Sequence, residues 1–243
     1  MSEPRDLREG WEQEAEQWVR WARKPGHDSY WRFHRDAFFS LVPPPGRLTL
    51  DVGCGEGRVA RDLRARGHRV IAVDSSETMV RFAVEEDPTI EALVADAAQL
   101  PFETATADLV VSFMSLQDTD DMPGAVREAA RVLAAGGRYC VAIVHPLNSA
   151  GAFTNREEEA SFSISDYMSE RRYSERVERD GLRLTFHQVH RPLQRYARAL
   201  EASGFVIETL HEVTVDPQSV GQRRDRVRWQ RMPLFLDLRA RKA

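Results

Sequence analysis

Cysteine and long apolar runs are scarce in this sequence. Cys54 and Cys140 are the only cysteines among 243 residues and stand far apart, which indicates neither a disulfide framework nor a metal site. No stretch approaches the roughly 18 apolar residues of a membrane helix, and the start of the chain lacks the apolar core of a secretion signal. We therefore expect a soluble, cytoplasmic protein with no metal and no membrane partner.

A strong net charge is also lacking. The formal charge is −4 and the pI is near 6.0, so no general attraction for nucleic acid is expected, although a local basic patch stays open. With a mass of 27.7 kDa the chain is long enough for one α/β domain with small additions. These values favour a small, roughly neutral partner, disfavour nucleic acid and leave a homodimer open.

A glycine-rich turn is the most informative stretch. A short apolar run ends on Asp51 and is followed by glycine at every second position, at Gly53, Gly55 and Gly57. Such glycines allow a sharp strand-to-helix turn and a close approach of the backbone to a ligand. A dinucleotide-binding GxGxxG pattern would need its last glycine where Arg58 stands, so the pattern is DxGxGxG and disfavours a pyrophosphate ligand.

This pattern resembles the first motif of the class I S-adenosylmethionine-dependent methyltransferases, a family of Rossmann-like enzymes that includes many small-molecule methyltransferases. The resemblance implies S-adenosylmethionine as cofactor and S-adenosylhomocysteine as product. It also implies that the turn contacts the cofactor through Asp51, Gly53, Cys54, Gly55 and Gly57.

Strand and helix patterns alternate along the chain, which is typical of a parallel α/β sheet. The expected strands are 48–51, 69–73, 91–95, 108–113, 138–144, 205–213 and 233–239, and the expected core helices are 57–66, 76–86, 124–134 and 191–202. Together with the resemblance, this predicts an α/β fold with a seven-stranded, mostly parallel sheet, an antiparallel C-terminal hairpin joined by a nonhelical loop, N-terminal helices and an insertion after the fifth strand.

The predicted division of the chain is an N-terminal helical lid over residues 1–42 and a cofactor-binding methyltransferase domain over 43–243. Within the second part, residues 147–190 are expected to be an insertion that covers the strand ends and forms the acceptor pocket. The segment 182–189 alternates as a strand, whereas 154–180 is highly charged and gives no clear pattern.

Ligands of such sheets lie at the carboxyl ends of the strands. Asp74 ends the second strand and can accept hydrogen bonds from a ribose diol, with Ser75 beside it, although an exposed or helix-capping aspartate is the alternative. By the resemblance, Asp96 and Ala97 after the third strand contact the adenine, and an ordinary loop aspartate is the alternative.

The fourth and fifth strands are expected to end beside the reacting groups. By the resemblance, Phe113 and Met114 supply apolar walls near the sulfonium and Gln117 a polar contact with the acceptor. His145 could remove a proton during methyl transfer, because its pKa lies near neutrality. Alternatively, His145 hydrogen-bonds the following proline turn and only orients the next segment.

Acceptor-binding candidates come from two other regions. Tyr30 and His34 share one face of an expected helix 28–39, which follows a first amphipathic helix over 5–22, and the resemblance implies that such N-terminal helices close over the cofactor and substrate. His190, Arg191 and Tyr196 stand at the entry of the helix 191–202, where the guanidinium could hold an anionic group. An ordinary structural role is the alternative for each of them.

The sequence therefore predicts transfer of the S-adenosylmethionine methyl group to an oxygen, nitrogen or carbon atom of a small molecule. One alternative is a protein or RNA acceptor, docked by a basic stretch that contains Arg223, Arg224, Arg226, Arg228 and Arg231 but that is also explained as a solvated loop. Another alternative is a protein that binds S-adenosylmethionine or S-adenosylhomocysteine without catalysis.

Overall fold

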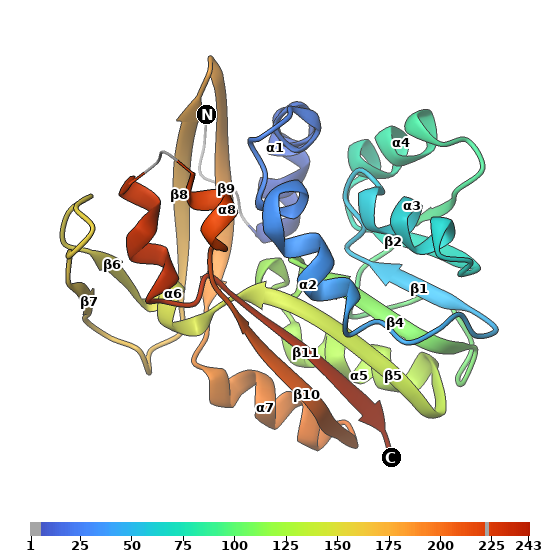
Figure 1. Cartoon of the computed structure of the whole chain (residues 1–243). Helices are drawn as coiled ribbons and strands as arrows, with labels where there is room; N and C mark the ends of the chain where they lie inside the picture. The colour runs from blue at the N-terminus through green and yellow to red at the C-terminus, as the bar shows by residue number, and fades with distance from the viewer. Residues whose placement is uncertain (1–5, 222–223) are drawn as a thin grey trace.

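A seven-stranded sheet forms the centre of the molecule (Figure 1). The computed structural model describes residues 6–221 and 224–243. The strands of the sheet, in spatial order, are β10 (Phe205–Val213), β11 (Phe235–Lys242), β5 (Leu133–Val144), β4 (Ala107–Phe113), β1 (Thr49–Val52), β2 (Val70–Asp74) and β3 (Glu91–Val94). Strands β1 to β5 are parallel, whereas β11 runs antiparallel to both β5 and β10. The predicted fold class is confirmed.

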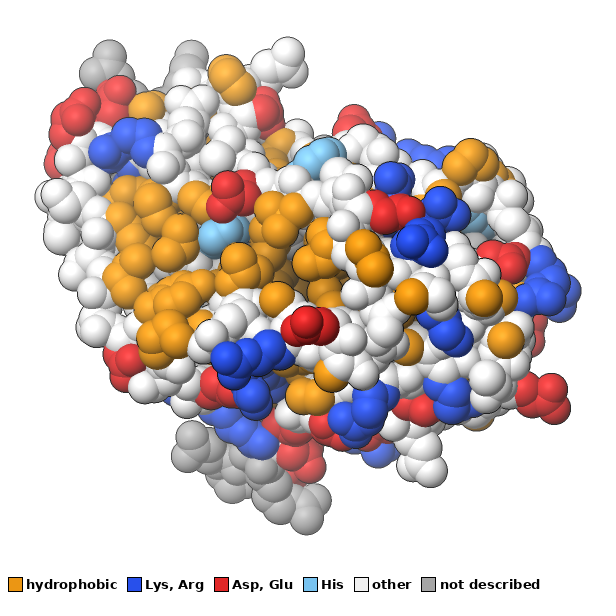
Figure 2. Space-filling model, turned by 90° about the horizontal axis from the view of Figure 1, so that it is seen from below, with side chains coloured by type: hydrophobic (Ala, Val, Ile, Leu, Met, Phe, Trp, Pro, Cys, Tyr) orange, Lys and Arg blue, Asp and Glu red, His pale blue; other side chains and the backbone are white. Residues whose placement is uncertain are grey.

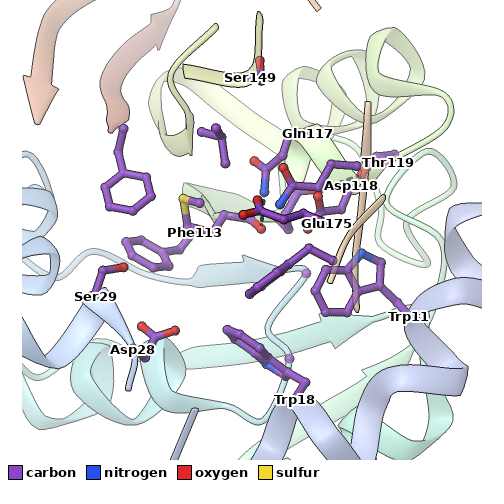
Figure 3. A pocket seen from close by; sticks show the side chains of 18 of the residues that line it. Trp11, Trp18, Asp28, Ser29, Phe113, Gln117, Asp118, Thr119, Ser149 and Glu175 are labelled. Carbon is purple, nitrogen blue, oxygen red and sulfur yellow. Dashed lines mark hydrogen bonds between the residues drawn. The ribbon is translucent and has the colours of Figure 1, made fainter. Parts of the chain in front are cut away.

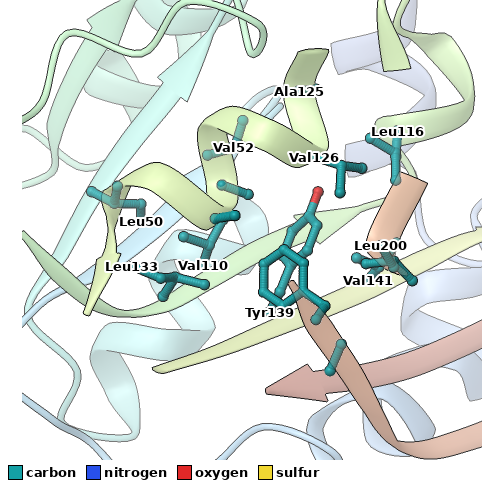
Figure 4. Close-up of a cluster of buried hydrophobic side chains, with 14 of the residues drawn as sticks. Leu50, Val52, Val110, Leu116, Ala125, Val126, Leu133, Tyr139, Val141 and Leu200 are labelled. Carbon is teal, nitrogen blue, oxygen red and sulfur yellow. The ribbon is translucent and has the colours of Figure 1, made fainter. Parts of the chain in front are cut away.

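Helices cover both faces of this sheet, so its strands are apolar on both sides. The helices are α3 (Arg58–Ala65), α4 (Glu77–Glu86), α5 (Met122–Val132) and α7 (Leu193–Ala202). Neighbouring residues of β4 alternate between the two core clusters: Val110 packs with side chains of α5 and α7, and Val111 with side chains of α3. Figure 4 shows the first cluster, in which the Tyr139 hydroxyl lies 3.0 Å from Ser112 Oγ.

The N-terminal segment forms a long helix and a shorter, irregular one. Helix α1 spans Leu7–Arg23, and a π-helical turn, Tyr30–His34, leads directly into α2 (Arg35–Phe39). The sequence predicted one regular helix over 28–39, but the wider turn brings both Tyr30 and His34 into the interior. The N–H of Tyr30 is held by the Asp28 carboxylate at 2.7 Å, which fixes the start of this turn.

Residues 146–190 form a second layer beside the sheet. A short helix α6 (Pro146–Ala150) leads into a small two-stranded sheet of β6 (Gly151–Phe153) and β7 (Phe162–Ile164), and a longer hairpin follows with β8 (Arg171–Arg179) and β9 (Leu182–His190). The sequence predicted β9 but not β8, because alternating arginine and glutamate in β8 leave few apolar positions for a strand pattern.

The hairpin β8–β9 stands next to α1 (Figure 1). The N–H of Thr185 in β9 donates to the Glu14 carboxylate at 3.2 Å. A Cβ atom at Gly10 of α1 would lie 3.0 Å from the ring of His187, so the helix and the strand touch closely at this position. The predicted lid and the predicted insertion therefore pack on each other.

The connection from β10 to β11 contains helical turns, although the sequence predicted a nonhelical loop. It includes α8 (Pro217–Val220) and the 3₁₀ segment Arg224–Gln230. Of its arginines, Arg223 lies outside the described residues. Arg231 is exposed but donates to the carbonyl oxygens of Glu158 and Ala160 at 2.7 and 2.9 Å, so it fastens the segment between β6 and β7.

The exposed apolar surface is local. Hydrophobic side chains gather on the left part of the face in Figure 2, and charged side chains are more frequent on its right part. The edge strand β10 exposes Val206, Ile207 and Leu210. None of the helices within residues 6–221 and 224–243 has the length and apolar character that crossing a bilayer requires.

A buried His–Asp pair joins the N-terminal segment to the sheet. His34 Nε2 lies 2.8 Å from Asp237 Oδ1 of β11, and both side chains have 0% exposure. The imidazole stacks on Phe235 with ring centroids 4.1 Å apart and planes 4° from parallel. A buried polar group that has lost its partner destabilises the folded state by more free energy than the intact pair contributes. Removal of either side chain should therefore lower the stability of the protein clearly.

We expect Asp237→Ala to lower the free energy of unfolding by about 3 kcal/mol, because His34 would lose its buried hydrogen-bond partner. Denaturant unfolding followed by circular dichroism measures the change. Asp36→Ala is the matched control, because the Asp36 carboxylate is 81% exposed beside Arg35 and should contribute little. Equal stability of the Asp237→Ala and control proteins would contradict a structural role of the pair.

Candidate functional site

A cavity of about 970 Å³ lies at the carboxyl ends of the parallel strands (Figure 3). Its floor consists of residues that follow β1, β2, β3 and β4, and its cover comes from α1, β6, β8 and β9. The parallel sheet therefore gathers its strand ends on one wall of the cavity, and the predicted lid and insertion form the opposite wall.

The glycine turn after β1 is clamped to its neighbours. The N–H groups of Gly53 and Cys54 both donate to the carbonyl oxygen of Val73, at 2.7 and 3.0 Å. A Cβ atom at Gly53 would lie 2.2 Å from Cβ of Ser115, so no side chain fits there. Gly55, with φ of +54°, has only the indole nitrogen of Trp18 near its side-chain position and therefore presents bare backbone to the cavity.

Asp74 links the turn to the end of β2. Its Oδ2 accepts from the N–H of Gly55 at 2.8 Å, and its Oδ1 accepts from the N–H of Ser76 at 2.9 Å. Burial raises the pKa of Asp74. Each carboxylate oxygen has a second acceptor position, so the group can still accept hydrogen bonds from a ligand.

The next strand end contributes a polar edge. Asp96 and Ala97 line the cavity after β3, as does Ser75 after β2. Asp96 Oδ1 accepts from the N–H of Ala98 at 2.8 Å, which orders the loop.

The end of β4 is strained and carries unpaired acceptors. Met114 has a positive φ of 56°, which is unusual for a residue with a side chain, and its carbonyl accepts from Gln117 Nε2 at 2.7 Å. Gln117 and Asp118 belong to the 3₁₀ turn η2 (Leu116–Asp118). Within the described part of the chain, Gln117 Oε1 and Asp118 Oδ1 are buried without a hydrogen-bond partner. Burial raises the pKa of Asp118 well above its usual range.

Aromatic side chains form the cover above these groups. The rings of Trp11 and Trp18 from α1 and of Phe186 from β9 pack edge to face with centroids 6.0 to 6.1 Å apart, and all three line the cavity. The sequence predicted an amphipathic helix over 5–22 and assigned none of its side chains to the site. The spacing of seven residues between the two tryptophans was the signal, because it places both on one helical face.

Arg58 is a further lining residue that the sequence did not identify as functional. Its guanidinium lies 4.6 Å from the ring centre of Tyr30 and 5.0 Å from that of Trp18, and one of its nitrogens lies 3.0 Å from the Asp28 carboxylate. Arg58 stands where the dinucleotide-binding motif has its last glycine. Its side chain therefore puts a buried guanidinium group next to the glycine turn.

Two residues of the predicted cofactor turn lie behind the cavity wall. Asp51 has 0% exposure, and burial together with the nearby Asp74 carboxylate raises its pKa to about 7. Gly57, with φ of +83°, starts α3, where a Cβ atom would lie 3.0 Å from Ala83. Both residues shape the turn from behind, and neither lines the cavity.

The structure gives no support for His145 as a base. His145 starts α6 and is buried outside the cavity wall. Its Nδ1 accepts from the N–H of Leu147 at 3.1 Å, and its Nε2 lies 3.0 Å from Glu212 of β10. Burial lowers the pKa of His145. Both ring nitrogens are occupied, as in the alternative in which this histidine orients the proline turn.

The predicted acceptor-binding residues also lie outside the wall. The Tyr30 hydroxyl donates to Asp62 at 2.6 Å, and His34 is paired with Asp237. His190 is buried between Ser149 Oγ at 2.7 Å and the carbonyl of Tyr167 at 2.9 Å. Their polar atoms are therefore used within the protein.

The other two predicted acceptor-binding residues, Arg191 and Tyr196, also lie outside the cavity wall. Arg191 is buried and donates to the carbonyl oxygens of Thr119 and Asp120 at 2.7 and 3.2 Å, so it stabilises the loop after β4 and does not face an anionic ligand. Tyr196 is 3% exposed and belongs to the core cluster between α7 and the sheet. Neither residue type nor position along the chain could reveal these partners.

The residues that remain on the wall fit S-adenosylmethionine. Asp74 retains acceptor capacity for hydroxyl groups, Gly55 offers backbone without a side chain, and the unpaired oxygens of Gln117 and Asp118 can accept from hydroxyl or ammonium donors. Within the described ranges, no group of three or more histidine, cysteine, aspartate or glutamate side chains is arranged to hold a metal ion.

Residues 50–141 match the family described as "Methyltransferase domain". A probable S-adenosylmethionine-dependent methyltransferase of Mycobacterium tuberculosis is 37% identical over 116 residues, which are 47% of this chain and 42% of that protein. The malonyl-[acyl-carrier protein] O-methyltransferase of Serratia marcescens is 37% identical over 93 residues, which are 38% of this chain and 36% of the relative. The matched segment thus spans about two fifths of these curated relatives.

Solved structures agree in fold over a larger part of the chain. An S-adenosylmethionine-dependent methyltransferase of Mesorhizobium loti has a TM-score of 0.72 at 24% identity, covering 85% of this chain and 96% of that one. A TehB-like methyltransferase of Corynebacterium glutamicum has a TM-score of 0.59 at 19% identity, covering 96% and 97%. In its domain match over residues 50–141 and in its fold, the chain is thus similar to class I S-adenosylmethionine-dependent methyltransferases.

Proposed function

We propose that this protein transfers the methyl group of S-adenosylmethionine to an oxygen, nitrogen or carbon nucleophile of a small-molecule acceptor and releases S-adenosylhomocysteine. The observation that carries the proposal is the continuous cavity. Its wall runs from the glycine turn and Asp74 at the strand ends to Trp11 and Phe186 in the cover. A single cavity that includes both the strand ends and the aromatic cover can hold a nucleoside cofactor and a second molecule side by side.

The strand-end residues would hold the cofactor. Asp74 would accept hydrogen bonds from the ribose hydroxyls, and the backbone of Gly55 allows close approach beside it. Asp96 and Ala97 would contact the adenine. Met114 would supply a polarisable apolar wall near the point where the two ligands meet.

The bound cofactor supplies an electrophilic methyl group on a sulfonium. The protein itself then contributes mainly by orienting the acceptor and by excluding water, which are the two effects that matter most for a donor that is already reactive. Trp11, Trp18 and Phe186 lie over the cavity and remove water from it. His145 is not required in this scheme.

A small acceptor is favoured over a macromolecule by the construction of the cover. The cavity lies beneath α1 and the hairpin β8–β9, which pack on each other. The basic stretch that could have docked nucleic acid is partly used inside the protein, since Arg231 binds carbonyl oxygens and Arg226 donates to the carbonyl of Ser219 at 2.9 Å.

Asp74→Ala should weaken binding of S-adenosylhomocysteine by about 10- to 100-fold, because the ribose hydroxyls would lose a carboxylate acceptor. Isothermal titration calorimetry measures the affinity, and circular dichroism checks that the variant is folded. Glu85→Ala, an exposed change on α4, is the control and should bind like the parent. Unchanged affinity of the folded Asp74→Ala protein would remove the ribose assignment.

The acceptor class can be tested with methyl-labelled S-adenosylmethionine and cell extract. We expect label to appear in the low-molecular-weight fraction and to be lost with Asp74→Ala, because the cavity admits small molecules. Label in protein or RNA instead would contradict the small-molecule proposal. Tight binding of the cofactor with no label in either fraction would contradict catalysis and favour a non-catalytic binding protein.

A further inference from the structure

Two carboxyl side chains enter the cavity from opposite walls. Asp118 follows β4 on the floor and Glu175 extends from β8 in the cover, and both line the cavity. Figure 3 shows both directed into it, near Gln117 in this view. Burial raises the pKa of Tyr173 most, and the Asp118 and Glu175 charges raise it further, so both carboxylates lie within electrostatic reach of its hydroxyl.

Neither carboxyl has a basic partner of its own. Within residues 6–221 and 224–243, no arginine, lysine or histidine forms a salt bridge with Asp118 or Glu175. Burial raises the pKa of both, although much of the Glu175 residue is exposed on the hairpin. A buried carboxylate without a salt-bridge partner, such as that of Asp118, is costly, and a ligand that supplies a cation would relieve that cost.

Two arginines near this part of the cavity bind other groups of the protein. Arg191, which acts on Asp118, donates to carbonyl oxygens and lies 3.6 Å from the Glu170 carboxylate. Arg172 pairs with Asp120 at 2.5 Å. Both guanidinium groups are therefore engaged with acceptors of the protein itself.

The aromatic side chains beside the two acids also suit a cation. Trp11 and Phe186 line the cavity together with Trp18, whose ring already has the Arg58 guanidinium 5.0 Å from its centre, and Tyr173 lies two residues from Glu175 on β8. Ring faces attract ammonium groups, and the attraction is larger where water is excluded. Carboxylates together with aromatic rings form a site that fits an amine joined to an apolar body.

The β6 part of the cavity has the opposite character. Arg228 lies 5.2 Å from the ring centre of Phe153, and its Nε and one terminal nitrogen are buried without a hydrogen-bond partner among the described residues. A cationic group is disfavoured beside this guanidinium. The charged group of an acceptor should therefore lie toward Asp118 and Glu175.

We propose that the acceptor is a basic small molecule whose protonated amine is bound by Asp118 and Glu175 while its apolar body packs on Trp11, Trp18 and Phe186. This inference rests on the proposed function, because it names the acceptor class of the same cavity. It concerns recognition of the charge and applies whichever atom of the acceptor receives the methyl group.

Three probes of similar shape test the inference: phenethylamine, 2-phenylethanol and 3-phenylpropionate, which are cationic, neutral and anionic at pH 7.5. Each is titrated into protein saturated with S-adenosylhomocysteine, and binding is followed by tryptophan fluorescence, since Trp11 and Trp18 line the cavity. We expect phenethylamine to bind at least about 10-fold more tightly than the neutral probe and the anion to bind most weakly.

Glu175→Gln should reduce this preference by about 10-fold, whereas the control Glu178→Gln should keep it. Glu178 is in the same strand but is exposed beside Arg183 and does not line the cavity. Asp118→Asn is the second test variant and should also reduce the preference. The S-adenosylhomocysteine affinity of each variant, measured in parallel, separates a loss of the preference from a loss of cofactor binding.

Equal binding of the cationic and neutral probes by the parent protein would overturn the inference. A preference that survives in both Glu175→Gln and Asp118→Asn would overturn it as well. The proposed function fails in a different way, since a parent protein that does not bind S-adenosylhomocysteine by calorimetry would contradict it before any probe is added.

Discussion

The site depends on one close contact between the ends of two parallel strands. Gly53 lies so near Ser115 that a Cβ atom would be 2.2 Å from the serine side chain, and Ser115 Oγ donates to the carbonyl of Val52 at 2.9 Å. On its other side the turn is bonded to Val73 and Asp74 of β2. Because the turn is held from both sides, its backbone conformation is set before a ligand arrives, and a preorganised site has less to order on binding.

Polar contacts also attach the cover to this rigid floor. The Glu12 carboxylate of α1 accepts from the hydroxyls of Ser76 and Thr78 at 2.5 and 2.6 Å, and the N–H of Leu7 donates to Asp120 at 3.0 Å. Polar contacts near the surface contribute little net stability because water competes for the same groups. The cover is held by buried packing as well, because Ala15 and Val19 of α1 form a core cluster with Met79 of α4, and the polar contacts add to this packing.

Local patterns in the sequence were sufficient to predict the sheet and the residues at its strand ends. The glycine turn, Asp74 and Asp96 follow strands directly, so the parallel order alone brings them to one cavity. The β8 strand and the helical turns before β11 were missed, because β8 alternates charges where an apolar pattern is required and the C-terminal segment is held by contacts distant in sequence. The cover residue Glu175 was missed for the same reason, since within a run of charged residues nothing marks the one that faces inward.

The difference between His145 and Asp118 shows why a titratable residue at a strand end is not enough to identify a reactive group. His145 follows the fifth strand in the expected place, yet both of its ring nitrogens already have partners in the protein. Asp118 is a less familiar candidate, but one of its oxygens is buried in the cavity wall and has no partner among the described residues. In folded proteins, buried polar groups normally have hydrogen-bond partners. A buried polar group without a partner at a ligand cavity therefore indicates a function more directly than residue type does. Only the three-dimensional structure reveals which groups are left unpaired, because the Nε2 partner of His145, Glu212 of β10, is distant in sequence and only its Nδ1 partner is local.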